Sequence, residues 1–482
     1  MTTPRLLGDG RRPVVLALMA TIGIASYNNL SVAAALPDIG DDLGNISLLP
    51  FVITVELLTS AVAVLAAGPI VDGLGARRTF RAATIGFVAT SILVAAAPTM
   101  PMLVAGRAIQ GVFAGAIMTV GVATIGLAIP MALRPRAFAL TSAIWGVMGV
   151  AGPAIAAVLV STVGWRGIFL VNIPVTVVAA IAGWHRIPDR HANATQQRFD
   201  GRGIALVAAI TTAALALASY QPVVIAAGLA VIMVTVPLYV RRSRRTAHPV
   251  VRIPHLLDAR YRTVHLTSMA VLAGGVGANS LLPLYLRTVR GQSNSAAAFS
   301  VLFLTIGWST SAWISSRLQD RFAAEWVSLL GAVIATPAAI ATALMIHLEA
   351  SLELIYAVFF WLGAGVGMVT STGAALLQSR TREDEMGRLT GAHQFLRTLA
   401  ITFGIAIVGA VTLAVVDARV GDVEVVRDLL SDDDVIVSAE ILESIGDGFA
   451  IAIAAMAVVV ATSLLSAVHL VRHRGQEVAS AP

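Results

Sequence analysis

Long runs of apolar residues, separated by short polar breaks, follow one another along nearly the whole of this 482-residue chain. A helix needs about 20 apolar residues to cross the hydrocarbon core of a bilayer, and it satisfies its own backbone hydrogen bonds there. Charged residues make up only 12% of the chain, against about 25% in an ordinary soluble domain. The sequence therefore predicts an all-α polytopic membrane protein.

The apolar runs divide into fourteen predicted transmembrane helices. Their approximate limits are 13–36, 48–71, 80–97, 101–129, 137–161, 167–184, 202–219, 222–240, 263–286, 295–316, 326–347, 353–377, 389–416 and 448–471. Prolines and short polar stretches such as "APTMP" and "YQP" mark the breaks between them.

The placement of arginine predicts the orientation of the spans, because basic residues gather in cytoplasmic loops. The chain has no lysine, so its 33 basic residues are all arginine, as is typical of a GC-rich bacterial gene. With the N-terminus inside, most arginines fall in cytoplasmic loops, and only an even number of spans preserves that bias. We expect a multi-pass protein of the bacterial plasma (inner) membrane with both termini in the cytoplasm.

The break between the seventh and eighth spans is very short, so these two spans should form a tight hairpin with six spans on either side. We expect three parts. They are an N-terminal six-helix bundle at 13–184, the inserted hairpin with flanking cytoplasmic segments at 185–262, and a C-terminal six-helix bundle at 263–471 that includes the outer loop 417–447. The inner loops "DGLGARR" (72–78) and "SRLQDRF" (316–322) each combine an aspartate with arginines, as expected for a parallel internal repeat.

The stretch "GPIVDGLGARR" contains Gly68, Asp72, Gly75, Arg77 and Arg78. It resembles the inner-loop signature of the major facilitator superfamily, although Gly73 and Ala76 stand where that family usually has basic residues. The glycines permit a tight turn and close helix approach, and Asp72 is placed to pair with an arginine or a helix N-terminus. We expect these five residues to form a conformational latch; the alternative is an ordinary solvated loop.

Two further stretches resemble helix motifs of the same superfamily. In "LVAGRAIQGVFAGA" (103–116), Arg107 and Gln110 match the fourth-helix motif, and an arginine within the membrane should face a cavity or a partner. The resemblance to drug/proton antiporters assigns this arginine to proton transfer; structural pairing with backbone carbonyls is the alternative. In "GVMGVAGPAIAA" (146–157), Gly149, Gly152 and Pro153 match a kinked, closely packed helix typical of exporters.

The stretches "GWRGIFLVNIP" (164–174) and "RFDGRG" (198–203) extend the resemblance to the fourteen-span drug/proton antiporter family, so that it covers nearly the whole chain. This resemblance implies two six-helix bundles that rock around a central site, with proton influx as the driving force.

The first span carries two adjacent amides, Asn28 and Asn29, in an otherwise apolar stretch. The resembling family usually has an aspartate where this chain has Asn28, and an asparagine can hydrogen-bond a ligand but cannot carry a proton. Glu56 is the only carboxylate well inside a predicted span. Our hypothesis is that Glu56 is the protonatable group and that Arg107 modulates it. A purely structural Glu56–Arg107 pair, or a glutamate that reaches the outer surface, is the alternative.

Several polar side chains within the spans are candidates for lining a substrate cavity. They are Asn28, Asn29, Gln110, Asn279, His393 and Arg397. Successive residues of a helix point about 100° apart, so we expect Asn28 to face the cavity and Asn29 to bond a neighbouring helix. For His393 and Arg397, four residues apart on one helix face, a cluster at the cytoplasmic helix end is the alternative.

The sequence favours a secondary-active exporter, coupled to protons, whose cargo is an amphipathic or lipophilic small molecule or a lipid. One alternative is a lipid or glycolipid translocator of the same fold with weak or no proton coupling; another is a non-transporting membrane sensor or scaffold. The chain shows no catalytic triad, zinc-ligand spacing or nucleotide loop, and it has no cysteine. We therefore expect no enzyme activity, metal, cofactor or nucleic-acid partner, and a monomer surrounded by membrane lipids. Multidrug efflux, and with it antibiotic resistance, is the expected role.

Overall fold

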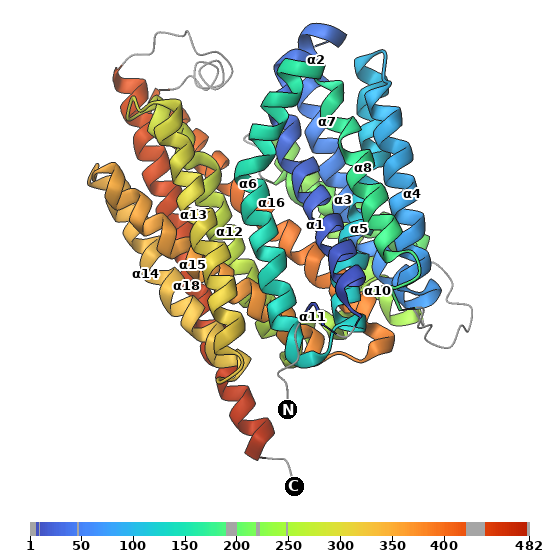
Figure 1. Ribbon diagram of the computed structural model, residues 1–482. Coiled ribbons are helices and arrows are strands. Elements are labelled where there is room, and N and C mark those ends of the chain that lie inside the picture. The colour runs from blue at the N-terminus through green and yellow to red at the C-terminus, as the bar shows by residue number, and fades with distance from the viewer. Residues whose placement is uncertain are drawn as a thin grey trace. The chain divides into compact units, whose positions relative to one another are not determined.

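The computed structural model describes residues 6–8, 10–45, 48–188, 200–217, 222–246, 249–420 and 439–479. Within them every regular element is a helix (Figure 1). The α-helices are α1 (Arg12–Ser31), α2 (Leu36–Leu43), α3 (Leu49–Leu74), α4 (Ala76–Ala95), α5 (Met100–Ala128), α6 (Arg134–Val163), α7 (Arg166–Leu170), α8 (Asn172–Gly183), α9 (Gly201–Ala216), α10 (Pro222–Arg245), α11 (Ile253–Leu257), α12 (Ala259–Thr288), α13 (Asn294–Leu318), α14 (Ala324–His347), α15 (Leu352–Ser379), α16 (Met386–Val420) and α18 (Ala439–Ala479). Short 3₁₀ turns occupy Val32–Ala35 (η1), Met131–Leu133 (η3) and Glu383–Glu385 (η4).

Among the described residues, ten helical segments are long and apolar enough to cross a membrane, and α6 makes eleven if its two bent halves count as one span. The bend in α6 is 41° and lies between Gly149 and Ala151, beside the predicted kink at Gly152 and Pro153. The all-α membrane architecture is therefore confirmed. The count of fourteen spans, which would add α1, α9 and α13, stays a prediction.

The first predicted span, 13–36, is shorter than expected. α1 ends at Ser31, a 3₁₀ turn follows, and a separate helix, α2, begins at Leu36. Pro37 stands in the first turn of α2, where its missing N–H is tolerated, whereas a continuous helix would lose a hydrogen bond at that proline.

The predicted inner loop at 72–78 consists of one residue. Asp72 belongs to the last turn of α3, and α4 begins at Ala76. Gly75 alone makes the turn, with φ at +87°, a backbone conformation that glycine adopts without steric cost. Asp72 is thereby held rigidly at a helix end.

The predicted outer loop 417–447 is also shorter than expected. α16 continues to Val420 and α18 begins at Ala439, so both ends of this range are helical. The segment after Ala439 is rich in alanine, glutamate, isoleucine and leucine, of which alanine, leucine and glutamate favour a helix outside the membrane as well. Residues 421–438, which hold the acidic tract, lie outside the described residues.

The chain divides into two compact units, of which the first comprises Met1–Ala208, Leu238–Asp258 and Ala374–Phe395. Within it α1, α3, α4, α5, α6 and α8 lie alongside one another (Figure 1). α3 and α5 approach each other most closely where α5 carries Gly111 and Gly115. A Cβ atom at Gly111 would overlap the carbonyl oxygen of Glu56, and one at Gly115 would overlap that of Ser60.

The second unit comprises Ala209–Pro237, Ala259–Gly373 and Leu396–Pro482. Its apolar core is built from α12, α13, α14, α15, the later part of α16, and α18. This division assigns parts of α15 and α16 to each unit, so the three-part division at 13–184, 185–262 and 263–471 stays a prediction.

The two halves of the chain repeat the same helix crossing. In the second unit, Gly363 of α15 abuts the carbonyl of Leu304, and Gly367 abuts that of Trp308, both on α13. The same number of residues separates Glu56 from Leu304 and Ser60 from Trp308. Asp72 and Asp320 are also separated by that number of residues. The resemblance between the two inner-loop stretches therefore extends to the contacts of the helices that carry them.

We expect Gly111→Ala to lower the thermal unfolding midpoint of the detergent-purified protein. The new methyl group would force α5 away from the Glu56 carbonyl, an overpacking cost of about 1–3 kcal/mol. Gly409→Ala is the matched control, because no atom lies within 4 Å of a Cβ at that helical glycine. Equal midpoints for the two variants would show that the α3–α5 crossing is not held at contact distance.

Candidate functional site

Six polar side chains meet inside the first unit, on five different helices. They are Asn28 (α1), Glu56 (α3), Ser91 (α4), Arg107 and Gln110 (α5) and Asn172 (α8). Each of these residues is at most 1% exposed. We call this group the polar cluster. Four of its six members, Asn28, Glu56, Arg107 and Gln110, are predicted from the sequence.

Arg107 is the centre of the polar cluster. Its Nε donates to the carbonyl of Val52 at 3.0 Å, and its Nη1 donates to Gln110 Oε1 at 2.7 Å and to Asn28 Oδ1 at 3.3 Å. Nη2 lies 3.5 Å from Glu56 Oε2, and the Phe169 ring lies 5.6 Å from the guanidinium carbon. A buried arginine is costly unless its donors are paired, and here all three nitrogens have partners.

Glu56 is held by two neighbours of different chemistry. Asn28 Nδ2 donates to Oε1 at 3.3 Å, while Oε2 faces Arg107 and accepts no hydrogen bond among the described residues. Desolvation of a buried carboxylate opposes its charge, and the arginine favours it. The charge state of Glu56 therefore depends on a balance that a small movement of α3 against α5 would change.

The local sequence explains why these groups meet. Arg107 stands one helical turn before Gly111, on the face of α5 that packs against α3. Because the glycines bring the two backbones together, the guanidinium reaches both the Val52 carbonyl and the Glu56 side chain. Gln110 extends the network to α4, since its Nε2 donates to Ser91 Oγ at 3.0 Å.

The corresponding crossing in the second unit is apolar. Gly363 corresponds to Gly111, and Leu304 corresponds to Glu56. In the same alignment of the two halves, Phe359 corresponds to Arg107 and Leu362 to Gln110. All three second-half residues are buried in the hydrophobic core. The charged crossing is therefore specific to the first half of the chain.

Asn172 and Ser91 are the members that sequence analysis missed. Asn172 Nδ2 donates to Asn28 Oδ1 at 3.4 Å, and its own Oδ1 has no hydrogen-bond partner among the described residues. The stretch "GWRGIFLVNIP" contains Asn172, but a lone asparagine or serine in an apolar helix gives no signal of which neighbour it meets.

The second candidate feature is a contact between α3 and the start of α16. Asp72 accepts hydrogen bonds from the backbone N–H groups of Gly387 at 2.6 Å and Arg388 at 2.9 Å, and Arg388 Nη1 lies 3.9 Å away. Gly68 faces Gly387 so closely that a Cβ on either would overlap the other's carbonyl oxygen. We call this contact the clasp; it joins a carboxylate to the positive end of a helix.

The other predicted latch residues lie apart from Asp72. Gly75 makes the turn, Arg77 Nε donates to the carbonyl of Ile187 at 2.8 Å, and Arg78 is exposed. Arg77 and Arg78 lie on α4, which leads away from the end of α3. The hydrogen bonds to Asp72 come instead from Gly387 and Arg388.

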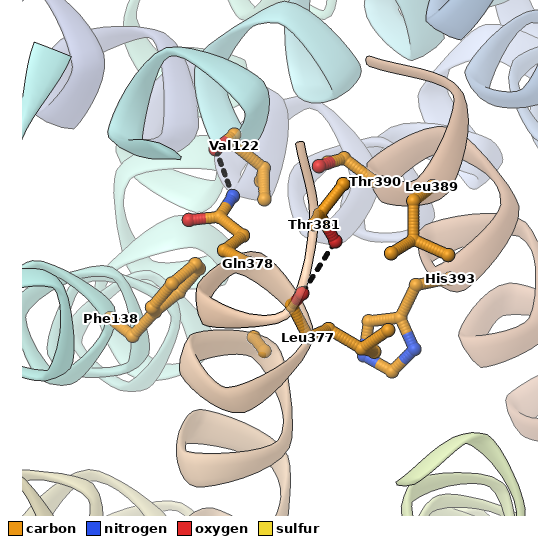
Figure 2. Close-up of a pocket in the computed structure, with 9 residues that line it drawn as sticks. Val122, Phe138, Leu377, Gln378, Thr381, Leu389, Thr390 and His393 are labelled. Atoms are coloured by element: carbon orange, nitrogen blue, oxygen red, sulfur yellow. Dashed lines mark hydrogen bonds between the residues drawn. The ribbon is translucent and has the colours of Figure 1, made fainter. Parts of the chain in front are cut away.

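The remaining cavity candidates are dispersed. His393 lines a small cavity with Gln378, Thr390 and other side chains of α5, α6, α15 and α16, in which Gln378 Nε2 donates to the Val122 carbonyl at 2.8 Å (Figure 2). The cavity volume is about 10 Å³, enough for about one water molecule. Asn279 and Arg397 are half-buried in the second unit, and the side chain of Asn29 lies outside the described part of the chain.

A further charged pair joins Asp42 of α2 to Arg166 of α7. Asp42 Oδ2 accepts from Arg166 Nη1 at 2.7 Å and from Trp165 Nε1 at 3.0 Å. The hydrogen bond from Arg166 lowers the pKa of Asp42 below its ordinary value, with Trp165 contributing in the same direction. This contact ties α2 to the start of α7.

Among the described residues, no group of three or more His, Cys, Asp or Glu side chains could hold a metal ion. The repeated helix crossing, the apolar spans and the buried polar cluster in one half together define a helical membrane transporter. A sequence model of the Major Facilitator Superfamily matches residues 16–405, and the chain belongs to this family. Its members are transporters and not enzymes, and the resemblance seen in the sequence is confirmed.

Curated relatives named for multidrug transport or for drug resistance and export are similar over most of the chain. The multidrug transporter protein MdtP of Bacillus subtilis is 24% identical over 83% of this chain and 75% of its own. The tetracenomycin C resistance and export protein of Streptomyces glaucescens is 25% identical, over 85% and 77%. An uncharacterised transporter of the same superfamily from Mycobacterium tuberculosis is 28% identical over 86% of this chain, but this chain spans only 62% of that protein.

Solved structures support the same fold. The human organic anion transporter MFSD10 superposes with a TM-score of 0.64, covering 96% of this chain and 99% of its own at 14% identity. The proton:xylose symporter XylE superposes with a TM-score of 0.60, covering 94% of each chain at 14% identity. At these identities the likeness shows the fold alone.

We expect Arg107→Phe to destabilise the protein by about 3–5 kcal/mol, because it leaves Glu56 buried without its counter-charge. Adding Glu56→Leu and Gln110→Leu copies the apolar crossing of the second half and should recover most of the loss. Thermal unfolding midpoints in detergent measure both variants. A triple variant no more stable than Arg107→Phe would mean that the first half cannot accept the apolar crossing.

Proposed function

We propose that the protein is a proton-coupled exporter of amphipathic or lipophilic small molecules that works by alternating access. Membership of a transporter family supports this proposal, as do one relative named a multidrug transporter and another named a resistance and export protein. The observation that carries it is the buried Glu56–Arg107 pair in the polar cluster. A carboxylate at this depth can take up and release a proton while the remaining contacts keep the helices together.

Arg107 can remain satisfied in either charge state of Glu56. Protonation of Glu56 would remove the ion pair, but the Val52 carbonyl, Gln110 and Asn28 still accept from the guanidinium. Hydrogen bonds to a charged group are worth about 1.5–3 kcal/mol each, so these three contacts hold the arginine in place. The proton then changes the α3–α5 contact without unfolding it.

We further propose that the clasp holds the cytoplasmic side closed in one state of the cycle and opens in the other. Asp72 and the first turn of α16 belong to segments that the proposed architecture places in different bundles. Both termini then lie in the cytoplasm, and the protein resides as a monomer in the bacterial inner membrane. Outer contacts such as Asp42–Arg166 lie on the opposite side.

One observation favours a lipid or glycolipid translocator as the second candidate. Arg107 already neutralises Glu56, and Asn28 replaces the acid that resembling antiporters carry, so the polar cluster offers no free negative charge for a cationic drug. A neutral or lipidic cargo fits this better. Proton flux stimulated by the cargo in reconstituted vesicles distinguishes the two candidates.

We expect Glu56→Gln to reduce dye efflux driven by a pH gradient at least tenfold in reconstituted vesicles, because the amide carries no exchangeable charge. Binding of the dye should change little, since glutamine preserves the size and hydrogen-bonding capacity of the side chain. Glu349→Gln, which changes an exposed carboxylate, is the control. Gradient-driven efflux at the wild-type rate in Glu56→Gln would refute the coupling role.

We expect Asp72→Ala to open the cytoplasmic side. The chain has no cysteine, so a single Thr390→Cys substitution next to the clasp reports its opening through labelling by a membrane-impermeant maleimide in inside-out vesicles. Asp72→Ala removes two hydrogen bonds to a charged acceptor, a loss that shifts the equilibrium tenfold or more. An unchanged labelling rate would show that the clasp does not control access.

A further inference from the structure

The inserted hairpin is connected to the clasp by a continuous series of polar contacts, all within the first unit. The connection runs from the end of α10 through residues 249–258 to the 3₁₀ turn that precedes α16. We call residues 249–258 the strap. Among the contacts of the described residues, the strap meets the segment that precedes the clasp at Glu385.

The first connection fixes the strap to α10. Tyr239 lies on α10, and its hydroxyl accepts from the N–H of Val251 and donates to the Val251 carbonyl, both at 2.9 Å. Ser243 Oγ donates to the same carbonyl at 3.1 Å. One turn of α10 therefore satisfies both backbone polar groups of a strap residue that is 5% exposed.

The base of the hairpin is fixed as well. Asp200 caps α9 by accepting from the N–H of Gly203 at 3.0 Å, and the same oxygen accepts from Arg242 Nε at 2.6 Å. Asp200 is 5% exposed. The start of α9 and the end of α10 are thus joined by an ion pair between the buried Asp200 and the half-buried Arg242, and the strap follows α10 along the chain.

The second connection fixes the strap to the clasp. Arg252 Nη1 pairs with Glu385 Oε1, and His255 Nε2 lies 3.2 Å from Glu385 Oε2. Glu385 ends the 3₁₀ turn directly before Met386, and Gly387 and Arg388 supply the two N–H groups that Asp72 accepts. The strap therefore holds the segment whose N–H groups must point at Asp72.

Charged groups surround the contact of Glu385 with Arg252 and His255. Burial lowers the pKa of His255, Glu385 acts in the opposite direction, and Arg252 and Arg388 add to the lowering. Arg388 also faces Asp72. Glu385 thus lies among two arginines and a histidine, which fixes the position of its carboxylate.

We propose that Glu385 is a positioning residue of the clasp, and that the inserted hairpin stabilises the closed clasp through the strap. The hairpin then sets the fraction of time that the cytoplasmic side is open. This proposal rests on the proposed role of the clasp in alternating access.

The test compares two neighbouring carboxylates in the Thr390→Cys background, with the full-length protein in inside-out vesicles. Glu385→Gln should raise the rate of maleimide labelling about two- to fivefold, the range for loss of a partly exposed ion pair. Asp384→Asn should change it far less, because the ion pair of Asp384 is with the exposed Arg382 and its influence on Arg388 is weaker than that of Glu385. Equal unfolding midpoints for the two variants separate positioning from loss of structure.

Two further variants examine the path from the hairpin. Tyr239→Phe removes the hydroxyl that holds Val251 and should raise labelling in the same direction as Glu385→Gln, whereas Thr235→Val, on the same helix, should not, because its hydroxyl donates only within α10. Exchanging the charges, with Arg252→Glu and Glu385→Arg together, should restore slow labelling that Arg252→Glu alone loses.

The outcomes separate the two proposals. If Asp72→Ala raises labelling and Glu385→Gln and Tyr239→Phe do not, the strap proposal is wrong and the clasp stands. If Asp72→Ala itself has no effect, the proposed role of the clasp fails first.

Discussion

The constraint on which the structure depends is that a charge buried between membrane helices must find its partners there. Arg107 meets this constraint with a carbonyl, two amides and a carboxylate, contributed by α1, α3 and α5. The glycines of α5 make the contact possible, because only their missing side chains let α5 approach α3 at this distance. The pairing of Arg107 with Glu56 at the crossing of α3 and α5 therefore depends on the close packing of these two helices.

Much of the fold follows from the sequence, since the length of an apolar run and the placement of arginine are physical consequences of the bilayer. Glu56, Arg107 and Asn28 could be singled out because a polar residue in an apolar helix is costly, and Asp72 because its stretch resembles an inner-loop signature. The pairing of Glu56 with Arg107 could be foreseen, because no other carboxylate lies well inside a predicted span, but their other partners could not. Gly387, Asn172 and Ser91 are distant in sequence from the groups they contact, and a pattern along one helix does not specify which other helix it meets.

The ends of the helices were also difficult to predict from the sequence. A proline in the first turn of α2 and one glycine with positive φ at the end of α3 decide where helices end, and hydropathy averaged along a span does not detect either. The difference matters for function, because it moves Asp72 from a flexible loop to a rigid helix end. A carboxylate fixed there can align with the N-terminus of another helix.

The second half of the chain serves as an internal comparison for the polar cluster. It builds the same crossing with Leu304, Phe359 and Leu362, so the fold itself does not require an ion pair at this point. A buried ion pair adds little net stability over well-packed apolar residues. Packing alone therefore does not account for Glu56 and Arg107 in one half when the other half uses apolar residues. A carboxylate whose charge can change is what the proposed proton coupling requires.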